Sequence, residues 1–200
     1  MSRTKLARIA AASAMVAAAT GSVLSIAPHA SASGSHGLDT HGKVTAKTSL
    51  SVHTAPSTHA PSAGKAIKHG QKITIDCNLN GTSVKGNDTW YKLANREAWV
   101  SAKYVKTSGA KPVACTAAQT AADRNATSTT GLRIRTAPTT KDKVAGSVGK
   151  HSKVDVWCKV KSQSIKGNKT WYLVTKRGND GWVSAKYIKT NKHIHFCTEE

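Results

Sequence analysis

The chain has 200 residues, and its 30 lysines and arginines outnumber its 10 aspartates and glutamates, which gives a formal net charge of +20 at pH 7. A charge of this size predicts attraction to polyanions. Most of the excess is Lys, a hydrated point charge, so the composition favours diffuse attraction and argues against bidentate recognition of single phosphates or carboxylates.

Residues 1–32 are predicted to be a secretory signal peptide. Three basic residues precede an Ala-rich apolar run, which polar residues and Pro28 interrupt before it is long enough for a transmembrane helix. We expect cleavage after Ala32 and no transmembrane segment in the mature chain. Cleavage leaves 27 basic and 10 acidic residues, a charge of +17. Outside the cell the abundant polyanions are wall polymers and lipid headgroups, so we expect no binding of nucleic acid.

Two segments contain almost no large apolar residue. Residues 33–46, with Ser, Gly and His, are expected to form a flexible N-terminal arm. Residues 116–130 are rich in Ala, Thr and Ser and are expected to be a linker. They flank and separate two predicted domains, at residues 47–115 and 131–200.

The two predicted domains share one sequence pattern. The blocks LSVHTAPST, KITIDC, KGNDTWYKL and AWVSAKYVKT of the first match LRIRTAPTT, KVDVWC, KGNKTWYLV and GWVSAKYIKT of the second. Each copy runs 66 residues from its first Leu to its last Cys, and eight of the ten aromatic residues fall into matched pairs. Such self-similarity predicts two copies of one fold.

Within each copy the pattern is that of β-strands. Apolar residues alternate over short runs, for example at Leu50 and Val52 and at Ile73 and Ile75, and turn-forming residues separate these runs. The Lys-Gly-Asn of each copy is expected to form the turn before the Trp-Tyr strand. A unit of about 60 residues buries only a marginal core, so we expect closure into a small barrel and a covalent staple.

Four cysteines in an exported chain allow three disulfide pairings. Each copy has one Cys at the end of its second strand and one after its last strand. Pairing Cys77 with Cys115 and Cys158 with Cys197 therefore uses the same arrangement twice. In a chain-entropy model, each bridge closes a loop of about 40 residues and stabilises the fold by about 4 kcal/mol.

Two other roles for the cysteines stay open. A single Cys with a distant His can act as a thiol nucleophile, as in small exported wall hydrolases, although none of the four has the flanking residues of a nucleophile. His193, His195 and Cys197 share one face of an extended segment, where Cys158 could join them around a metal ion, but the spacing is not that of a known zinc site. We therefore predict no cofactor, no bound metal and no enzymatic activity.

The order and spacing of the matched blocks resemble the bacterial SH3 domain. Its usual pattern has an alternating first strand with a Gly/Ala-Pro turn, a Trp-Tyr strand and a closing Gly-Trp-Val-Ser-x-x-Tyr-Val. The resemblance implies an all-β fold of two small SH3-like five-stranded barrels in tandem, with 3₁₀ turns at residues 101–104 and 184–187. Each barrel would contain one disulfide. Such domains are non-catalytic and commonly target the cell wall or bind ligands.

The resemblance also implies a ligand groove lined by aromatic residues, beside the loop after the first strand. Carried over by position, the groove residues are Trp90 and Tyr104 in the first copy and Trp171 and Tyr187 in the second. One ring of each Trp-Tyr pair must point into the core, so a core position is the alternative for both tryptophans. Trp99 and Trp182 are expected in the core.

Arg133 and Arg135 are further candidates for ligand binding. They lie where eukaryotic SH3 domains have the acidic residues that help to bind polyproline. The basic first loop of this chain therefore favours an anionic or carboxylate-bearing ligand.

These observations predict an exported protein that attaches to the bacterial cell envelope through peptidoglycan or an anionic wall polymer. It would be secreted, and extracellular or associated with the cell wall. Two domains on one chain would combine weak affinities. An extracellular module that binds another exported protein, as an adaptor or inhibitor, is the alternative, and a small wall hydrolase is the third. The sequence assigns no role to His193 and His195.

Overall fold

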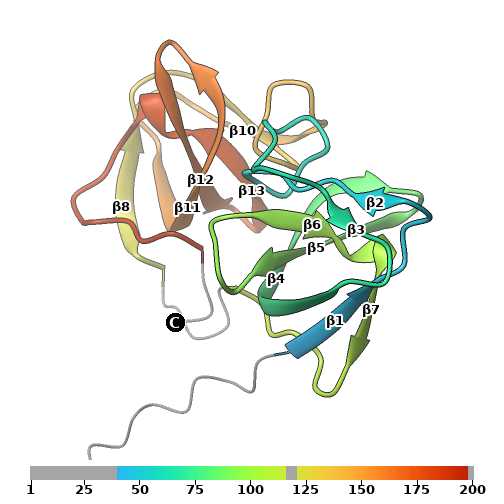
Figure 1. Cartoon of the computed structure of the whole chain (residues 1–200). Helices are drawn as coiled ribbons and strands as arrows, with labels where there is room; N and C mark the ends of the chain where they lie inside the picture. The colour runs from blue at the N-terminus through green and yellow to red at the C-terminus, as the bar shows by residue number, and fades with distance from the viewer. Residues whose placement is uncertain (1–39, 116–120, 198–200) are drawn as a thin grey trace, which may run out of the picture. The chain divides into compact units, whose positions relative to one another are not determined.

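The computed structural model describes residues 40–115 and 121–197, which fall within one compact unit (Figure 1). We call them the N-terminal half and the C-terminal half. The expected signal peptide, the arm up to residue 39 and residues 116–120 of the expected linker lie outside the described residues. In the two described ranges no helix is long and apolar enough to cross a membrane.

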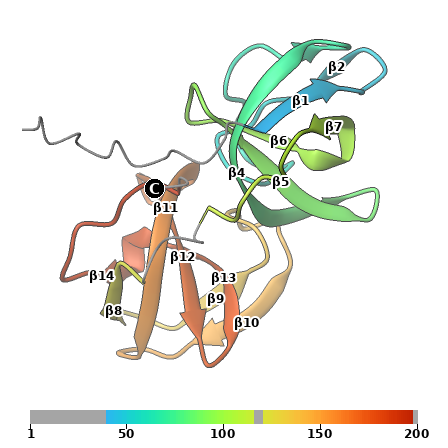
Figure 2. The same cartoon turned by 90° about the horizontal axis from the view of Figure 1, so that it is seen from below.

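The N-terminal half contains an antiparallel five-stranded sheet in the order β6-β5-β4-β1-β7 and a two-stranded sheet, β2-β3. Its centre is the long hairpin of β4 and β5, visible in both views (Figures 1 and 2). The elements are β1 (Thr40–Val44), β2 (Ser49–Leu50), β3 (Ile67–Lys68), β4 (Lys72–Val84), β5 (Asn87–Leu93), β6 (Trp99–Ser101), the 3₁₀ turn η1 (Ala102–Tyr104) and β7 (Val105–Ser108).

The C-terminal half contains a seven-stranded sheet in the order β10-β9-β13-β12-β11-β8-β14. Its longest strands, β11 and β12, form a hairpin that corresponds to β4 and β5 (Figure 2). The elements are β8 (Asp123–Ser128), β9 (Leu132–Arg135), β10 (Val144–Val148), β11 (Lys153–Ile165), β12 (Asn168–Lys176), β13 (Asn179–Ser184), the 3₁₀ turn η2 (Ala185–Tyr187) and β14 (Ile188–Lys189).

The two long hairpins turn at the same dipeptide. Lys85 and Gly86 join β4 to β5 with φ angles of 48° and 81°, and Lys166 and Gly167 join β11 to β12 with 46° and 84°. Two successive positive φ angles are typical of the tight turn that matches the twist of a hairpin. The expectation of a turn before each Trp-Tyr strand is thus confirmed.

The expectation of two equal five-stranded barrels is confirmed only as an all-β fold, because no sheet of the described residues closes. In the C-terminal half, a bridge between Arg135 and Trp182 adds the β9-β10 hairpin to the main sheet. In the N-terminal half, the corresponding bridge joins His53 to Trp99, but β2 ends before His53 and β2-β3 remains a separate sheet. The main sheet therefore has seven strands where the short hairpin β9-β10 reaches it, and five where the shorter hairpin β2-β3 does not.

Two strands lie in segments that were expected to be irregular. β1 belongs to the expected arm and pairs with β4 and β7. β8 belongs to the expected linker and pairs with β11 and β14. Both expectations are wrong for these residues. A strand between two neighbours is stabilised by backbone hydrogen bonds on both of its edges, so it does not require large apolar side chains. Only small residues fit at some positions, since a Cβ on Gly42 of β1 would lie 2.5 Å from Val105 Cγ1.

Buried side chains form three clusters. One lies in each half, around Val52 and Val100 in the N-terminal half and around Val156 and Val183 in the C-terminal half. The third contains residues of both halves: all four cysteines and the tryptophans Trp90, Trp99, Trp171 and Trp182. Trp99 and Trp182 are each 1% exposed, as expected for core residues.

Candidate functional site

A hollow of about 710 Å³ opens on the N-terminal half beside the loop that follows β2. We call this hollow the groove. Apolar and aromatic side chains line it together with lysines and small polar residues, a composition suited to a ligand with both apolar and anionic parts. Among its lining residues are Leu50, His53, Val84, Lys85, Trp90 and Tyr104.

Trp90 lies at the groove but is largely a core residue. Its side chain is among the largest fully buried ones, with the residue 1% exposed, and its Nε1 donates a hydrogen bond of 2.9 Å to Thr82 O. The ring of His53 meets it edge to face, with centroids 5.6 Å apart and planes at 82°. Because the indole is buried and its nitrogen is already hydrogen-bonded, Trp90 can offer a ligand little more than an edge of its ring.

Tyr104 is the more accessible aromatic residue of the groove. It is the last residue of the short turn η1, which Ser101 caps by accepting a hydrogen bond of 3.3 Å from Lys103 N. Tyr104 O accepts a hydrogen bond from Thr45 N at 2.9 Å, which ties the turn to the segment after β1. The turn that carries Tyr104 is therefore held in place, and the half-buried residue stays partly open to a ligand.

The C-terminal half repeats this construction around Trp171 and Tyr187. Trp171 is 2% exposed, and its Nε1 donates a hydrogen bond of 2.8 Å to Gln163 O. Tyr187 O accepts hydrogen bonds from Thr129 N at 2.9 Å and from Thr129 Oγ1 at 3.2 Å. Two hollows of this half, one at the hairpin turn and one beside Gly146, include neither Trp171 nor Tyr187.

Arg133 and Arg135 do not meet the residues of the groove. Arg133 is exposed on β9, whereas Arg135 is half-buried and its Nη1 donates a hydrogen bond of 2.8 Å to Asp142 O. In the N-terminal half, the cations at the groove are Lys47 and Lys85 instead. Of the six predicted ligand-binding residues, the structure brings together Trp90 and Tyr104.

Residues 130–189 match the family model described as the bacterial SH3 domain. The C-terminal half therefore contains a bacterial SH3 domain. The match begins just after β8 and ends with β14, so it includes the long hairpin, η2 and the two predicted groove residues of this half, Trp171 and Tyr187. A comparison with curated proteins found no match to the chain.

Two solved structures from Trichomonas vaginalis are similar to the chain over much of its length. They are NlpC2, with 14% identity and a TM-score of 0.29 over 77% of this chain, and NlpC1, with 13% identity and a TM-score of 0.29 over 80%. This chain spans 49% of the length of each.

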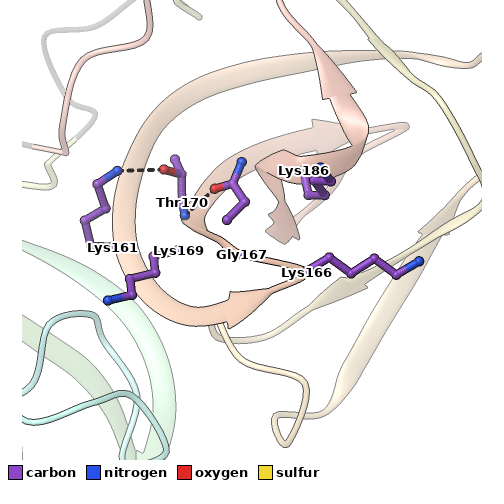
Figure 3. A pocket seen from close by; sticks show the side chains of 7 residues that line it. Lys161, Lys166, Gly167, Lys169, Thr170 and Lys186 are labelled. Carbon is purple, nitrogen blue, oxygen red and sulfur yellow. Dashed lines mark hydrogen bonds between the residues drawn. The ribbon is translucent and has the colours of Figure 1, made fainter.

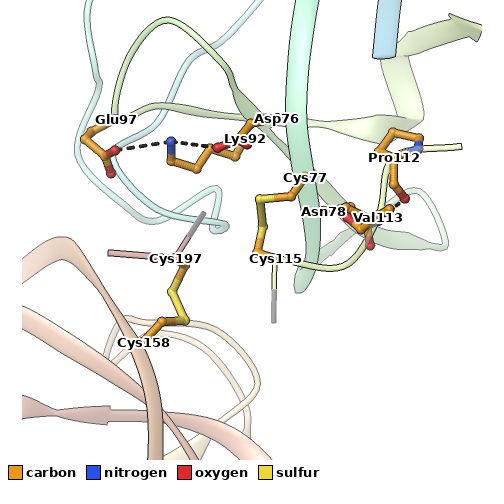
Figure 4. Close-up of a disulfide and its surroundings, with 10 residues drawn as sticks. All are labelled: Asp76, Cys77, Asn78, Lys92, Glu97, Pro112, Val113, Cys115, Cys158 and Cys197. Atoms are coloured by element: carbon orange, nitrogen blue, oxygen red, sulfur yellow. Dashed lines mark hydrogen bonds and ion pairs between the residues drawn. A yellow bond between two sulfur atoms is a disulfide. The ribbon is translucent and has the colours of Figure 1, made fainter. Parts of the chain in front are cut away.

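Both predicted disulfides are present: Cys77 pairs with Cys115, and Cys158 with Cys197 (Figure 4). Each joins the first strand of a long hairpin, β4 or β11, to the segment after the last strand of the same half. Neither a free thiol for nucleophilic attack nor a Cys ligand for His193 and His195 remains, since all four cysteines are in disulfides. The two histidine rings pack edge to face, with centroids 4.9 Å apart.

A second hollow, of about 580 Å³, lies at the hairpin turn of the SH3 domain and was not predicted (Figure 3). Its charged lining residues are Lys161, Lys166, Lys169 and Lys186, and we call these four the lysine cluster. The sequence signal was present in KGNKTWY, whose counterpart KGNDTWY has an Asp in place of the second Lys. One charge in a matched block is easily missed when two of the four lysines, Lys161 and Lys186, lie in other segments.

The sequence also gave no sign of a buried carboxylate, Asp142. It is 6% exposed and accepts hydrogen bonds from hydroxyl groups of Ser57, Thr82 and Thr139. Burial by itself raises the pKa of Asp142, but hydrogen bonds from these hydroxyls and from His59 outweigh burial and lower the pKa overall. This residue stabilises the fold and does not line the groove or the lysine cluster.

Proposed function

We propose that the protein is an exported, non-catalytic binding protein that attaches to the bacterial cell envelope. The observation that carries this proposal is the bacterial SH3 domain at residues 130–189. Domains of this family commonly serve as wall-targeting modules. The charge of +17 expected for the mature chain supports the same conclusion, because the cell wall is rich in anionic polymers.

The N-terminal half is proposed to be a second SH3-like unit that supplies the aromatic groove. Its long hairpin, its Ala-Lys-Tyr 3₁₀ turn and its disulfide correspond to those of the SH3 domain. The indole hydrogen bonds of Trp90 and Trp171 also correspond, since both acceptors lie eight positions before the tryptophan. Two binding units on one chain raise the effective local concentration of each for a polymeric ligand.

An extracellular location and a non-catalytic role are supported by the cysteines. Disulfides persist in oxidising compartments outside the cytosol, which agrees with the signal peptide predicted from the sequence. Because both disulfides consume all four thiols, a cysteine nucleophile is unavailable in the oxidised protein.

The proposal is tested by retention of the mature protein on purified bacterial cell walls that contain peptidoglycan and polyol-phosphate polymers. We expect retention that persists at about 0.15 M salt, where long-range attraction between exposed charges is screened. The variant Tyr104→Ala should weaken retention, while Tyr104→Phe, which keeps the ring, should not. Walls that fail to retain the protein at this salt would overturn the proposal, and salt-insensitive binding to an exported protein would favour an adaptor or inhibitor.

A further inference from the structure

The lysine cluster lies around a rigid turn. Lys161 comes from β11, Lys166 from the hairpin turn, Lys169 from the start of β12 and Lys186 from η2. Asn168 Oδ1 accepts a hydrogen bond of 2.8 Å from Thr170 N, so the chain after the turn is fixed. All four lysine residues are exposed.

No acidic residue lines this hollow. The ion pairs among residues 40–115 and 121–197 use His59 and Lys92, and none of them includes a member of the lysine cluster. Lys161 Nζ donates a hydrogen bond of 2.8 Å to the neutral Thr170 Oγ1, which orients its ammonium group without neutralising it (Figure 3). Four positively charged residues therefore line one open hollow, and their mutual repulsion falls when an anion binds there.

The chemistry of the cluster selects among anions. An ammonium group is a compact point charge that attracts phosphate without requiring the planar fit of an arginine to a carboxylate. Figure 3 shows Lys166 extending away from Lys161 and Lys169, so a single small anion cannot contact the whole set. A chain with a phosphate in every repeating unit can place successive charges near successive lysines.

The N-terminal half lacks this arrangement, although its hairpin corresponds residue by residue. The counterparts of Lys161, Lys166, Lys169 and Lys186 are Asn80, Lys85, Asp88 and Lys103. The formal charge of the four positions is thus +4 in the SH3 domain and +1 in the N-terminal half. The two hairpins are similar in sequence and in turn geometry, so the main difference between them at these four positions is their charge.

We propose that the lysine cluster binds a linear phosphate-bearing polymer of the cell wall. The inference rests on the proposed function and adds a ligand class and a division between the halves. The SH3 domain holds the anionic polymer through the lysine cluster, and the N-terminal half contacts a less charged part of the wall through the groove.

The direct test is titration of the mature protein with soluble polyglycerol phosphate. The variant Lys161→Asn with Lys169→Asp gives the SH3 domain the residues of the N-terminal half and should weaken binding roughly 10- to 100-fold. The control Lys65→Asp with Lys150→Asn makes the same change of charge at exposed positions outside the described hollows and should weaken it by less than about threefold. Equal losses in the two variants would overturn the proposal.

A variant that gains affinity for the polymer tests the same proposal without depending on a loss of affinity. Asn80→Lys with Asp88→Lys reproduces the cluster in the N-terminal half, where both positions are exposed. We expect this variant to bind polyglycerol phosphate about tenfold more tightly. Unchanged affinity in a variant that melts at the temperature of the wild type would contradict the proposed site.

Two further probes test the choice of a polymer as the ligand. Inorganic phosphate, and vesicles that contain phosphatidylglycerol, should both bind much more weakly than polyglycerol phosphate at equal phosphate concentration and about 0.15 M salt. Equal binding of inorganic phosphate would indicate a small-anion site, and equal binding of vesicles would indicate a membrane surface. Either result overturns the polymer proposal.

Cell walls with and without their phosphate polymers separate this inference from the proposed function. If the wild type is retained equally by both and the lysine variants change nothing, attachment to the wall stands and the polymer site is wrong. If the protein binds soluble polyglycerol phosphate through the lysine cluster but neither wall preparation retains it, the polymer site stands and the proposed function is wrong.

Discussion

The hydroxyl of Ser57 donates a hydrogen bond of 2.9 Å to Oδ2 of Asp142, across 85 positions of the sequence. Thr139, the counterpart of Ser57 in the second Ala-Pro turn, donates to the same oxygen at 2.7 Å. Thr82 Oγ1 donates to Oδ1 at 2.7 Å, and His59 Nδ1 lies 3.0 Å from that oxygen. Two matching turns of the sequence thus meet at one buried carboxylate.

Replacing this carboxylate should destabilise the protein. Asp142→Asn leaves one of the buried hydroxyls without a good acceptor, because an amide has one oxygen where the carboxylate has two. We expect a loss of about 1–3 kcal/mol in the free energy of unfolding, measured by urea denaturation. Asp88→Asn, at an exposed position, is the control and should change it by less than about 0.5 kcal/mol. Equal stabilities of the two variants would contradict this role of Asp142.

The same residue predicts how stability depends on pH. Hydrogen bonds lower the pKa of Asp142 in the folded state below its ordinary value of 3.8. The carboxylate therefore contributes stability that is complete above this value and is lost as the pH falls through the lower, folded-state pKa. The difference in stability between the wild type and Asp142→Asn should shrink between about pH 5 and about pH 2. A difference that grows on acidification would show that the sign is wrong.

Replacing the buried tryptophans should lower the stability of the fold, so such variants are poor probes of ligand binding. Because Trp90 and Trp171 are fully buried, Trp90→Ala and Trp171→Ala should each cost about 3–5 kcal/mol. Tyr104→Ala, at a half-buried position, should cost less and is the better probe of the groove. Urea denaturation of the three variants checks this order, which is wrong if either Trp variant unfolds at the same urea concentration as the wild type.

The N-terminal half has a buried lysine, Lys92, at a position where the C-terminal half has an apolar residue. Lys92 is 3% exposed, and its Nζ lies 3.2 Å from Asp76 Oδ2 and 3.2 Å from Glu97 Oε1 (Figure 4). Its counterpart in the SH3 domain is Leu173. We expect Lys92→Leu to change the free energy of unfolding by less than about 1 kcal/mol, because the carboxylate that loses its partner, Asp76, is partly exposed. Asp76→Ala should lower it by about 3 kcal/mol, because the buried ammonium group of Lys92 then keeps only the exposed Glu97 as a partner.

Glu97→Ala is the control for this pair of variants. The Glu97 side chain is 54% exposed, so its ion pair with Lys92 is screened by water and should contribute less than about 1 kcal/mol. Thermal unfolding of the three variants ranks them directly. A larger loss for Lys92→Leu than for Asp76→Ala would mean that the ion pair itself, and not the avoidance of an unpaired charge, stabilises this strand pair.

The β-strand class and the hairpin turns followed from local sequence, and the disulfides followed from the repeat. Alternating apolar residues and the Lys-Gly dipeptides act within a few residues, so the long hairpins could be predicted. The comparison of the two copies then chose one cysteine pairing out of three, which the structure contains. The strands β1 and β8 could not be found in this way, since their polar and small residues form strands only when neighbours on both sides supply hydrogen bonds.

The sequence by itself determined that this protein is a basic, disulfide-bonded β protein with two matched halves and a bacterial SH3 pattern. Only the tertiary structure decided that Trp90 is buried, that Asp142 joins two turns and that four lysines surround one hollow. The physical reason is range. Strand patterns and turns depend on neighbours along the chain, whereas burial, hydrogen bonding and charge density depend on residues that only the folded chain brings together.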